Sequence, residues 1–459
     1  MIMKKLISIN PTTQEVVHSY QVHSSEEIAF ILSQAEEAQK FWASSTISFR
    51  NSCLEQLSGV LKDKAREYAK LMALEMGKPL DQGVLEVEKC AWLCDYYREY
   101  GEEFLMDKPV ETENTKSFIS IEPLGLVLGV MPWNFPFWQV FRFALPAITA
   151  GNGAILKHAS NVQGCAAAIK TCFKEAGYPD NIFHNLVIPG NQVKQIIEHK
   201  AISAVTITGS TPAGKAVAAA AGTVLKKTVL ELGGSDPYVI LDDANLDQAV
   251  AACVAGRLLN AGQSCIAAKR LIVTKKNENQ FITRLEKELN RKVLGDPMDE
   301  VDMGPMVSIA ARNQVHDQVQ SSIASGASLK MGGIIPNEIG AYYPITLLTD
   351  VKPGMVAFDE EIFGPVFAIV TAENEDHTIE LANWSEFGLG AAVFTADLKR
   401  GEEIARKKIR AGSCFVNDFV KSDPRLPFGG VKNSGYGREL SIYGMMEFVN
   451  VKTIVVNKV

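Results

Sequence analysis

Short apolar segments alternate with helix-like segments between residues 154 and 230, and this alternation restricts the chain to one class of fold. The apolar segments lie at 154–156, 186–188, 204–208 and 228–230, with helices predicted at 162–176, before residue 204 and after Pro212. Strands and helices that alternate in this way form a parallel sheet with crossover helices. A second alternation follows Pro237 and extends to about Gly437. The sequence therefore predicts an α/β protein with two lobes.

The two ends of the chain show other patterns. Residues 24–100 read as helices, one over 26–42 and another over 50–76 that stops at the segment Gly-Lys-Pro. Residues 117–130 are strand-like around a Pro-Leu-Gly turn, which predicts a hairpin. Residues 448–459 alternate apolar and polar side chains, and a long exposed edge strand is a liability unless it pairs with another subunit. We therefore expect a homo-oligomer.

Composition narrows the classes of function. The 459 residues are 47% hydrophobic and 22% charged, enough for two or three domains with their own cores. The net charge is -7 and the sequence has no long Lys/Arg run. It therefore lacks the basic patch that is usual in proteins that bind nucleic acid or anionic membranes. The N-terminal apolar run is too short for a signal peptide, and prolines interrupt the charge-poor stretch 123–141. The eight scattered cysteines favour the cytoplasm, and the seven histidines form no metal-ligand cluster, so we expect no metal.

Cys265 is the candidate nucleophile. It lies in the segment AGQSCIAAKR (261–270), downstream of a carboxylate, Glu231, that opens a Leu-Gly-Gly segment. A thiolate is the strongest soft nucleophile at neutral pH, and small neighbours such as Gly262, Ser264 and Ala267 let a substrate approach it. The alternatives are a buried structural cysteine and a salt-bridged glutamate at the end of a strand.

Asn134 is the candidate oxyanion donor. It stands between prolines and aromatic residues in MPWNFP (131–136), a segment too restrained for an ordinary loop. One side-chain amide and the backbone N–H of the nucleophile are a sufficient pair of donors for the developing charge. A turn-forming asparagine is the alternative.

Six segments in one order resemble the signatures of the NAD(P)-dependent aldehyde dehydrogenase superfamily. They are PWNFP (132–136), TGST (208–211), ELGG (231–234), GQSC (262–265), EEIFGP (360–365) and PFGG (427–430). Each is weak alone, but their common order over nearly the whole chain argues against chance. The resemblance implies a Rossmann-type NAD(P)-binding domain, an α/β catalytic domain and a β oligomerisation arm. Their expected bounds are 1–116 and 131–233, 234–437, and 117–130 and 438–459.

The resemblance also assigns chemical roles. Cys265 adds to an aldehyde to give a thiohemiacetal, the Asn134 side chain and the Cys265 N–H stabilise the oxyanion, and Glu231 activates the water that hydrolyses the thioester. Family members that pass the acyl group to coenzyme A commonly lack this glutamate. Its presence favours hydrolysis to an acid.

The cofactor is expected at residues 208–214, where a strand end opens a helix and backbone N–H groups can hold a pyrophosphate. A simple helix cap by Ser210 or Thr211, with Pro212 in the first turn, is the compatible alternative. By resemblance, the cofactor-contacting residues are Trp133, Lys157, Ser160, Gly209, Ser210, Leu232, Glu361 and Phe363.

Ser160 bears on the choice of cofactor. Family members that strongly prefer NAD tend to carry a glutamate at this position, where a carboxylate repels a 2′-phosphate. Serine removes that repulsion, and Lys157 adds a nearby cation. The sequence therefore predicts that NADP is preferred to NAD, while Ser160 as a helix cap is an alternative that does not exclude this.

Arg142, Ser422 and Arg425 are the candidate substrate residues. A helix from Pro136 directs Arg142 toward the substrate mouth, where semialdehyde dehydrogenases of the family hold the distal carboxylate with an arginine. An internal salt bridge is the alternative. The loop 420–427 is expected to add the Ser422 hydroxyl and the Arg425 cation, because Leu259 stands where related enzymes often carry a second arginine.

These patterns predict oxidation of succinate semialdehyde to succinate by a cytoplasmic homodimer or homotetramer. Glutarate semialdehyde or a broad range of aliphatic aldehydes is the alternative, because added methylenes are weakly discriminated. A non-catalytic binding or structural relative is the alternative from another class. Apart from a small aldehyde and the cofactor, we expect neither nucleic acid nor membrane as a partner.

Overall fold

The helical segment predicted near the N-terminus forms four helices in the computed structural model, which describes residues 5–458. They are α1 (Ser25–Ala43), α2 (Ile47–Asp63), α3 (Ala65–Met76) and α4 (Leu80–Leu105). The single helix predicted over 50–76 is two helices, because Lys64 leaves helical geometry with φ -105° and ψ 11°. Gly77 ends α3 as predicted, with a φ of 79° that glycine adopts without strain.

The first alternation forms a six-stranded sheet in the order β17-β9-β8-β5-β6-β7, parallel except for β17. Its strands are β5 (Leu126–Met131), β6 (Gly153–His158), β7 (Phe183–Asn185), β8 (Ile202–Thr208), β9 (Lys227–Glu231) and β17 (Gly435–Tyr436). The helices between them are α5 (Trp138–Thr149), α6 (Gln163–Glu175), α7 (Val193–Glu198) and α8 (Thr211–Thr223), with a short turn η1 (Gly190–Gln192). The strand predicted at 186–188 lies instead at 183–185, where its backbone pairs with residues 154–156.

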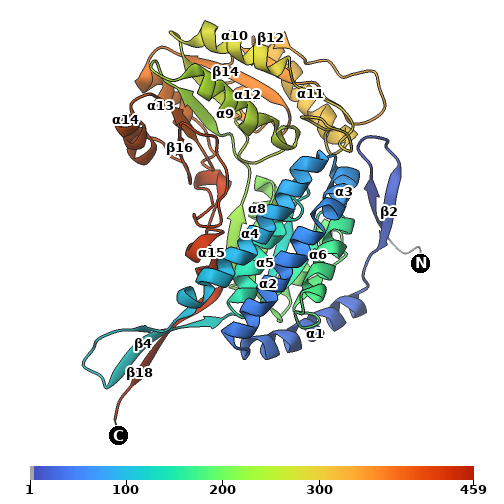
Figure 1. The fold of residues 1–459 in the computed structure, drawn as a ribbon, viewed down its shortest axis with the longest axis vertical. Coiled ribbons are helices and arrows are strands. Elements are labelled where there is room, and N and C mark those ends of the chain that lie inside the picture. Colours follow the sequence, from blue (N-terminus) through green and yellow to red (C-terminus); the bar gives the residue numbers. More distant parts are fainter. Residues whose placement is uncertain (1–4, 459) are drawn as a thin grey trace.

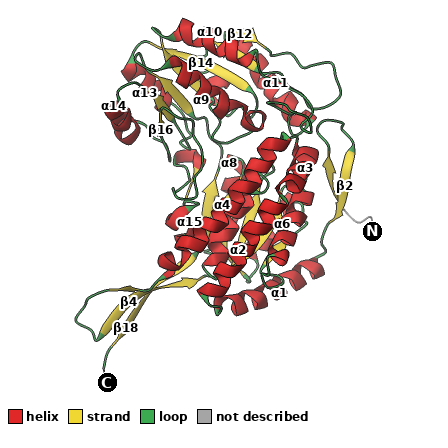
Figure 2. Cartoon of the chain, in the orientation of Figure 1, coloured by secondary structure: helices red, strands yellow, loops and turns green. Residues whose placement is uncertain are grey.

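The second alternation forms a seven-stranded sheet in the order β12-β13-β14-β11-β10-β15-β16, with only β12 antiparallel to its neighbour. Its strands are β10 (Pro237–Ile240), β11 (Arg270–Thr274), β12 (Ser328–Met331), β13 (Thr346–Thr349), β14 (Val366–Ala372), β15 (Ala392–Phe394) and β16 (Phe415–Val416). The helical elements are α9 (Leu246–Leu258), η2 (Leu259–Gly262), α10 (Glu278–Leu289), α11 (Ile309–Ala324), α12 (Val356–Asp359), α13 (Glu375–Asn383), α14 (Leu398–Glu403) and η3 (Ile404–Lys408). After this sheet the chain returns to the first lobe, where η4 (Lys432–Ser434) precedes β17 and α15 (Ser441–Met446) packs against α4 and α5. Figure 1 shows the two lobes, and Figure 2 shows helices α2, α4 and α6 in front of the strands of the first.

The hairpin predicted over residues 117–130 is wrong. Strand β4 (Lys116–Pro123) pairs with the C-terminal strand β18 (Val449–Val456) and with β3 (Lys108–Pro109), whereas β5 pairs with β6 and β8 in the six-stranded sheet. The physical reason is burial, because β5 is apolar on both faces and nearly all buried, while the side chains of β4 are mostly half-buried. The chain changes sheet at Gly125, where φ is 133°.

The C-terminal strand predicted over 448–459 is present as β18, and its partner is β4 of the same chain. In Figure 1 this three-stranded sheet extends from the body as an arm. A separate two-stranded sheet, β1 (Lys5–Ile9) and β2 (Val16–Gln21), lies at the other end of the chain. Residues 1–4 begin the predicted NAD(P)-binding domain and residue 459 ends the predicted arm. Both lie outside the described residues. No helix between residues 5 and 458 has both the length and the apolar character needed to cross a membrane.

Candidate functional site

A cavity of about 290 Å³ has Cys265 in its wall, together with residues of α4, α5 and the loop between β16 and β17. Its lining is Gln82, Leu85, Glu86, Lys89, Phe135, Trp138, Gln139, Arg142, Gly256, Leu259, Ser264, Cys265, Ile266, Phe419, Val420, Lys421, Ser422 and Phe428. The walls are largely apolar with a few cationic and hydroxyl groups, the pattern of a small-molecule site.

The backbone leading to Cys265 is a tight left-handed turn. Asn260, Ala261 and Gly262 have φ values of 55°, 54° and 72°. Two non-glycine residues in this region cost free energy, and such strain is found most often at functional sites. Gly262 allows a close approach, because a Cβ there would lie 2.2 Å from the carbonyl oxygen of Gly364. The turn therefore holds the predicted nucleophile segment against the segment 360–365.

Asn134 lies against the nucleophile segment, as the sequence predicts. Its Nδ2 donates to the carbonyl oxygen of Gln263 at 3.0 Å, and its Oδ1 accepts from Gln139 Nε2 at 3.0 Å. Both ends of the buried side-chain amide are therefore held, and the Asn260 side chain fixes the backbone of the residue by donating to the Asn134 carbonyl oxygen at 2.8 Å. An amide nitrogen carries two hydrogens, and the described contacts use one of them. The other is available for a ligand.

Burial raises the pKa of the Cys265 thiol to about 12, while the positive charges of Lys269 and Arg142 act to lower it. Lys269 is itself buried and donates to the carbonyl oxygens of Ser264 (2.9 Å) and Cys265 (2.6 Å). Its ammonium also pairs with Glu361 Oε1 at 2.8 Å. Lys269 was not among the predicted site residues, although the sequence shows a cationic residue four positions after the candidate nucleophile.

Glu231 lies at the carboxyl end of β9 with only 2% of its surface exposed, and neither carboxylate oxygen has a hydrogen-bond partner among the described residues. Gly429 makes room for it, because a Cβ there would lie 2.7 Å from Glu231 Oε1. Burial and the nearby charge of Glu439 raise the pKa of Glu231 well above its ordinary value, and Arg142 and Arg438 oppose this. Arg142 thus acts electrostatically on both Glu231 and Cys265.

Several predicted cofactor residues lie at the carboxyl ends of the parallel strands in the six-stranded sheet. Lys157 is the residue before the last of β6, and Gly209 and Ser210 follow β8. The Gly209 N–H donates to the Glu231 carbonyl oxygen at 2.9 Å, and Ser210 caps α8 by accepting from the Ala213 N–H at 3.5 Å. Strand β5 has β6 on one side and β8 on the other. The carboxyl ends of these strands therefore form a switch point, the kind of place at which α/β sheets bind ligands.

The Lys157 ammonium is buried without a hydrogen bond or ion pair among the described residues, and burial lowers its pKa. Ser160 is half-buried in the connection to α6. The N-cap of that helix is Val162, so Ser160 as its cap, the alternative drawn from the sequence, is wrong.

The other predicted cofactor residues lie next to the nucleophile segment. Phe363 packs edge-on against Trp133 with ring centroids 5.8 Å apart. Glu361 accepts from the Gly234 N–H at 3.2 Å in addition to pairing with Lys269. Leu232 covers Gly214 of α8, where a Cβ would lie 2.4 Å from its methyl carbon.

The three predicted substrate residues are placed differently. Arg142 lines the cavity, but its Nε lies 2.7 Å from Glu439 Oε2, the internal salt bridge that the sequence left open, and both groups are buried. Ser422 also lines the cavity. The structure does not bring Arg425 there: its side chain is 65% exposed and binds both carboxylate oxygens of Asp423.

Lys89 lines the cavity and was not found from the sequence. Its Nζ donates to Ser422 Oγ at 2.9 Å and lies 4.6 Å from the centre of the Trp138 ring. Burial, and then the charge of Arg142, lower its pKa to about 8. The residue stands inside an ordinary helical pattern, so no motif distinguished it.

Between residues 5 and 458, no group of three or more His, Cys, Asp or Glu side chains is arranged to hold a metal ion.

A model of a known protein family matches nearly the whole chain. The model of the aldehyde dehydrogenase family matches residues 3–454. A probable NADP(+) succinate-semialdehyde dehydrogenase of Synechocystis sp. is 45% identical over 450 residues, which are 98% of this chain and 99% of that protein. The NAD(P)+ succinate semialdehyde dehydrogenase Sad of Escherichia coli K12 is 45% identical over 449 residues, 98% of this chain and 97% of that protein.

Solved structures show the same fold. A structure of Gox0499, described as giving insight into cofactor and substrate selection, superposes with a TM-score of 0.97 at 39% identity and covers 99% of this chain and 100% of that chain. Succinic semialdehyde dehydrogenase from Streptococcus pyogenes in complex with NADP+ superposes with a TM-score of 0.96 at 37% identity, with the same coverage.

Proposed function

The chain belongs to the aldehyde dehydrogenase family, and from this premise we propose that it oxidises succinate semialdehyde to succinate, with NADP preferred to NAD. One observation carries the choice of substrate: the cavity that contains the Cys265 thiol is also lined by the cations Lys89 and Arg142 and the hydroxyl of Ser422. An aldehyde with a carboxylate at its far end matches that combination of nucleophile and positive charge.

In the proposed reaction, the Cys265 thiolate adds to the aldehyde carbon and forms a thiohemiacetal. The oxyanion accepts hydrogen bonds from the free N–H of the Asn134 amide and from the Cys265 backbone N–H. When bound, the nicotinamide cofactor supplies the acceptor for the hydride of the aldehyde carbon. Glu231 then takes a proton from the water that attacks the thioester, and succinate leaves as Cys265 regains its thiol. The raised pKa of Glu231 makes its ionised form a stronger base for this step.

The residues at the carboxyl ends of the strands in the six-stranded sheet fit a dinucleotide that carries a 2′-phosphate. The buried Lys157 ammonium has no described partner, and such a group gains most from an anion or hydroxyl brought by a ligand. Ser160 adds a hydroxyl without the charge that repels a phosphate. We propose that Lys157 and Ser160 hold the adenosine ribose and its phosphate, Gly209 and Ser210 the pyrophosphate, and Trp133, Leu232, Glu361 and Phe363 the nicotinamide half.

Initial rates with succinate semialdehyde and with uncharged butanal, each with NADP and with NAD, test the proposal. We expect kcat/KM to favour the semialdehyde by about 10- to 100-fold, the size of one or two charge-assisted hydrogen bonds. Equal values would indicate a dehydrogenase of broad aliphatic specificity, and no rate with any aldehyde would indicate a non-catalytic relative. A kcat/KM that favours NAD by an order of magnitude would overturn the cofactor preference.

We also propose a domain division and a setting for the protein. The NAD(P)-binding domain takes residues 1–116 and 131–233 together with β5, the catalytic domain takes 234–437 apart from β17, which pairs with β9 of the first sheet, and β4 and residues 438–459 form the oligomerisation arm. A cytoplasmic location is supported by the eight cysteines, all of which are free thiols in the structure. A homodimer or homotetramer is supported by the edge strand β18.

A further inference from the structure

The cavity wall contains three cationic side chains, and they differ in their partners. Arg142 faces the buried Glu439, with Nε and Oε2 2.7 Å apart. Lys421 is half exposed and pairs with Asp418 Oδ2 at 2.6 Å. Among residues 5–458, no carboxylate lies within ion-pair distance of Lys89. A cation without a carboxylate partner at a largely apolar cavity is the one with most to gain from an anionic ligand.

Ser422 completes the site beside Lys89. Its Oγ accepts two hydrogen bonds, from Lys89 Nζ at 2.9 Å and from Trp138 Nε1 at 3.0 Å. A serine hydroxyl has one hydrogen to donate and two positions at which it accepts. Because both accepting positions are used, the hydroxyl hydrogen is left for a further acceptor. Lys89 spends one of its three N–H donors on Ser422, so the pair offers three donors in all.

We propose that Lys89 is a further specificity-determining residue, which binds the distal carboxylate of the substrate together with Ser422 and beside the Arg142 guanidinium. This inference rests on the proposed function, since it names the residues that select a semialdehyde. Trp138 holds the pair in place through its N–H and through its ring, whose centre lies 4.6 Å from Lys89 Nζ. The lowered pKa of Lys89 agrees with an ammonium that lacks an anion, and a bound carboxylate would restore its charge.

The test is Lys89→Met, assayed with NADP against succinate semialdehyde and butanal. We expect kcat/KM for the semialdehyde to fall at least about 10-fold through a higher KM, with kcat/KM for butanal within about twofold of wild type. Lys89→Arg should restore much of the semialdehyde value, and Lys89→Gln, which keeps a donor to Ser422, is a second uncharged variant. Lys62→Met is the matched control. Lys62 is an exposed lysine of α2 that pairs with Asp95 of α4 and does not line the cavity.

The outcomes separate this inference from the proposed function. A wild-type enzyme with no preference for the semialdehyde would overturn the proposed function itself. A wild-type preference that survives in both Lys89→Met and Lys89→Gln would overturn only the role of Lys89. An equal loss with both aldehydes would show that Lys89 supports the structure of the site rather than its specificity. The inhibition constant of succinate, which should rise in parallel with KM, gives a readout that does not depend on turnover of the aldehyde.

Discussion

Glu231 is buried, its carboxylate has no hydrogen-bond partner among residues 5–458, and the charge of a second buried carboxylate, Glu439, acts on it. Burial and like charge both favour its protonated form, so it is a carboxyl group with a strongly raised pKa rather than a permanent anion. Burying such a group without a partner costs folding free energy, and carboxyl groups with strongly raised pKa values are found most often at functional sites, where they exchange protons.

We therefore expect Glu231→Gln to lower steady-state kcat by about 10²- to 10⁴-fold, the usual contribution of a general base. Glutamine keeps the size of the side chain but cannot accept the proton of the attacking water. Acylation does not need that proton transfer, so rapid mixing should still show a burst of reduced cofactor of about one per active site. Cys265→Ala is the control and should abolish the burst. Loss of the burst in Glu231→Gln as well would place the glutamate before hydride transfer.

The sequence identifies residues inside motifs better than residues that meet across the fold. Cys265 and Asn134 belong to recognisable segments, and the structure brings these together through the contact with Gln263. Lys89 meets Ser422 across 333 positions of sequence, and Arg142 finds Glu439 near the other end of the chain. Such pairings depend on how the lobes pack, which no local pattern contains.

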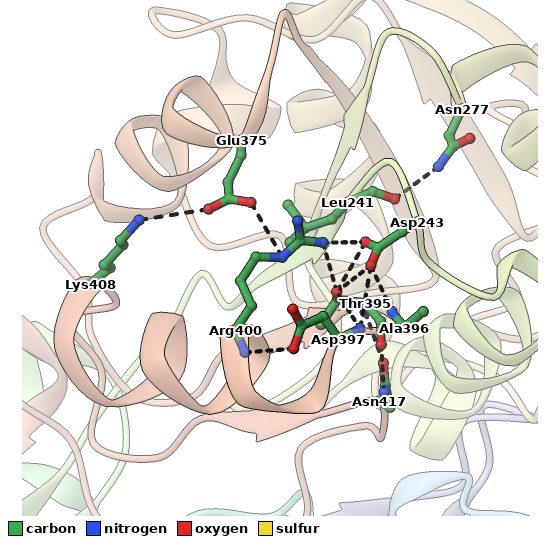
Figure 3. Close-up of polar contacts among 10 residues, drawn as sticks. All are labelled: Leu241, Asp243, Asn277, Glu375, Thr395, Ala396, Asp397, Arg400, Lys408 and Asn417. Atoms are coloured by element: carbon green, nitrogen blue, oxygen red, sulfur yellow. Dashed lines mark hydrogen bonds and ion pairs between the residues drawn. The ribbon is translucent and has the colours of Figure 1, made fainter.

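The two sheets carry different side chains at their switch points. In the seven-stranded sheet, the order reverses between β10 and β15, and polar side chains occupy the space beyond their carboxyl ends (Figure 3). Asp243 accepts from Thr395 Oγ1 at 2.9 Å, from the Ala396 N–H at 3.1 Å, and from Arg400. This network ties the β10 and β15 ends to α14.

We expect Asp243→Asn to lower the free energy of unfolding by about 1 kcal/mol at neutral pH, because the network loses its charge and the site is partly exposed. Partial burial acts to raise the pKa of Asp243, but the Thr395 hydrogen bond and the Arg400 charge outweigh it and lower the pKa overall. A lowered pKa stabilises the fold above the ordinary carboxyl range and loses that effect as the pH falls. Urea titrations from pH 7 to about pH 3.5 should show the gap between variant and wild type closing at the acid end.

Asp242→Asn is the matched control, since this neighbouring aspartate is exposed and has no part in the contacts of Figure 3. A constant gap at every pH, or the same loss in the control, would argue against an electrostatic role for Asp243.

The elements themselves were largely predictable, and the exceptions have a physical cause. Periodicity located the helical segments of the first lobe, although it merged α2 and α3 into one helix, and it placed the strands expected at 154–156, 204–208 and 228–230 within a few residues. It failed at 117–130 because two neighbouring strand-like segments suggest a hairpin, while pairing is decided by burial. The apolar β5 reaches a sheet covered on both faces, and β4 finds its partner in β18, more than 300 positions away along the chain.

The arm has one edge that the described chain does not cover. Strand β18 pairs with β4 along one side, and between residues 5 and 458 no strand pairs with its other side. The exposed fractions of Val451 and Val455 are 58% and 50%. An extended edge with apolar side chains favours association, and natural proteins block such edges with charges or cover them.

We therefore expect light scattering to give a mass well above the 50.1 kDa of one chain. The double variant Val451→Lys and Val455→Lys should reduce that mass toward the mass of the monomer. Two lysines on one face of the strand place like charges at the contact without altering the backbone of the arm. Leu398→Lys is the control, because this exposed leucine lies on α14, far from the arm in Figure 1. A wild-type monomer, or a double variant of unchanged mass, would show that β18 does not join subunits.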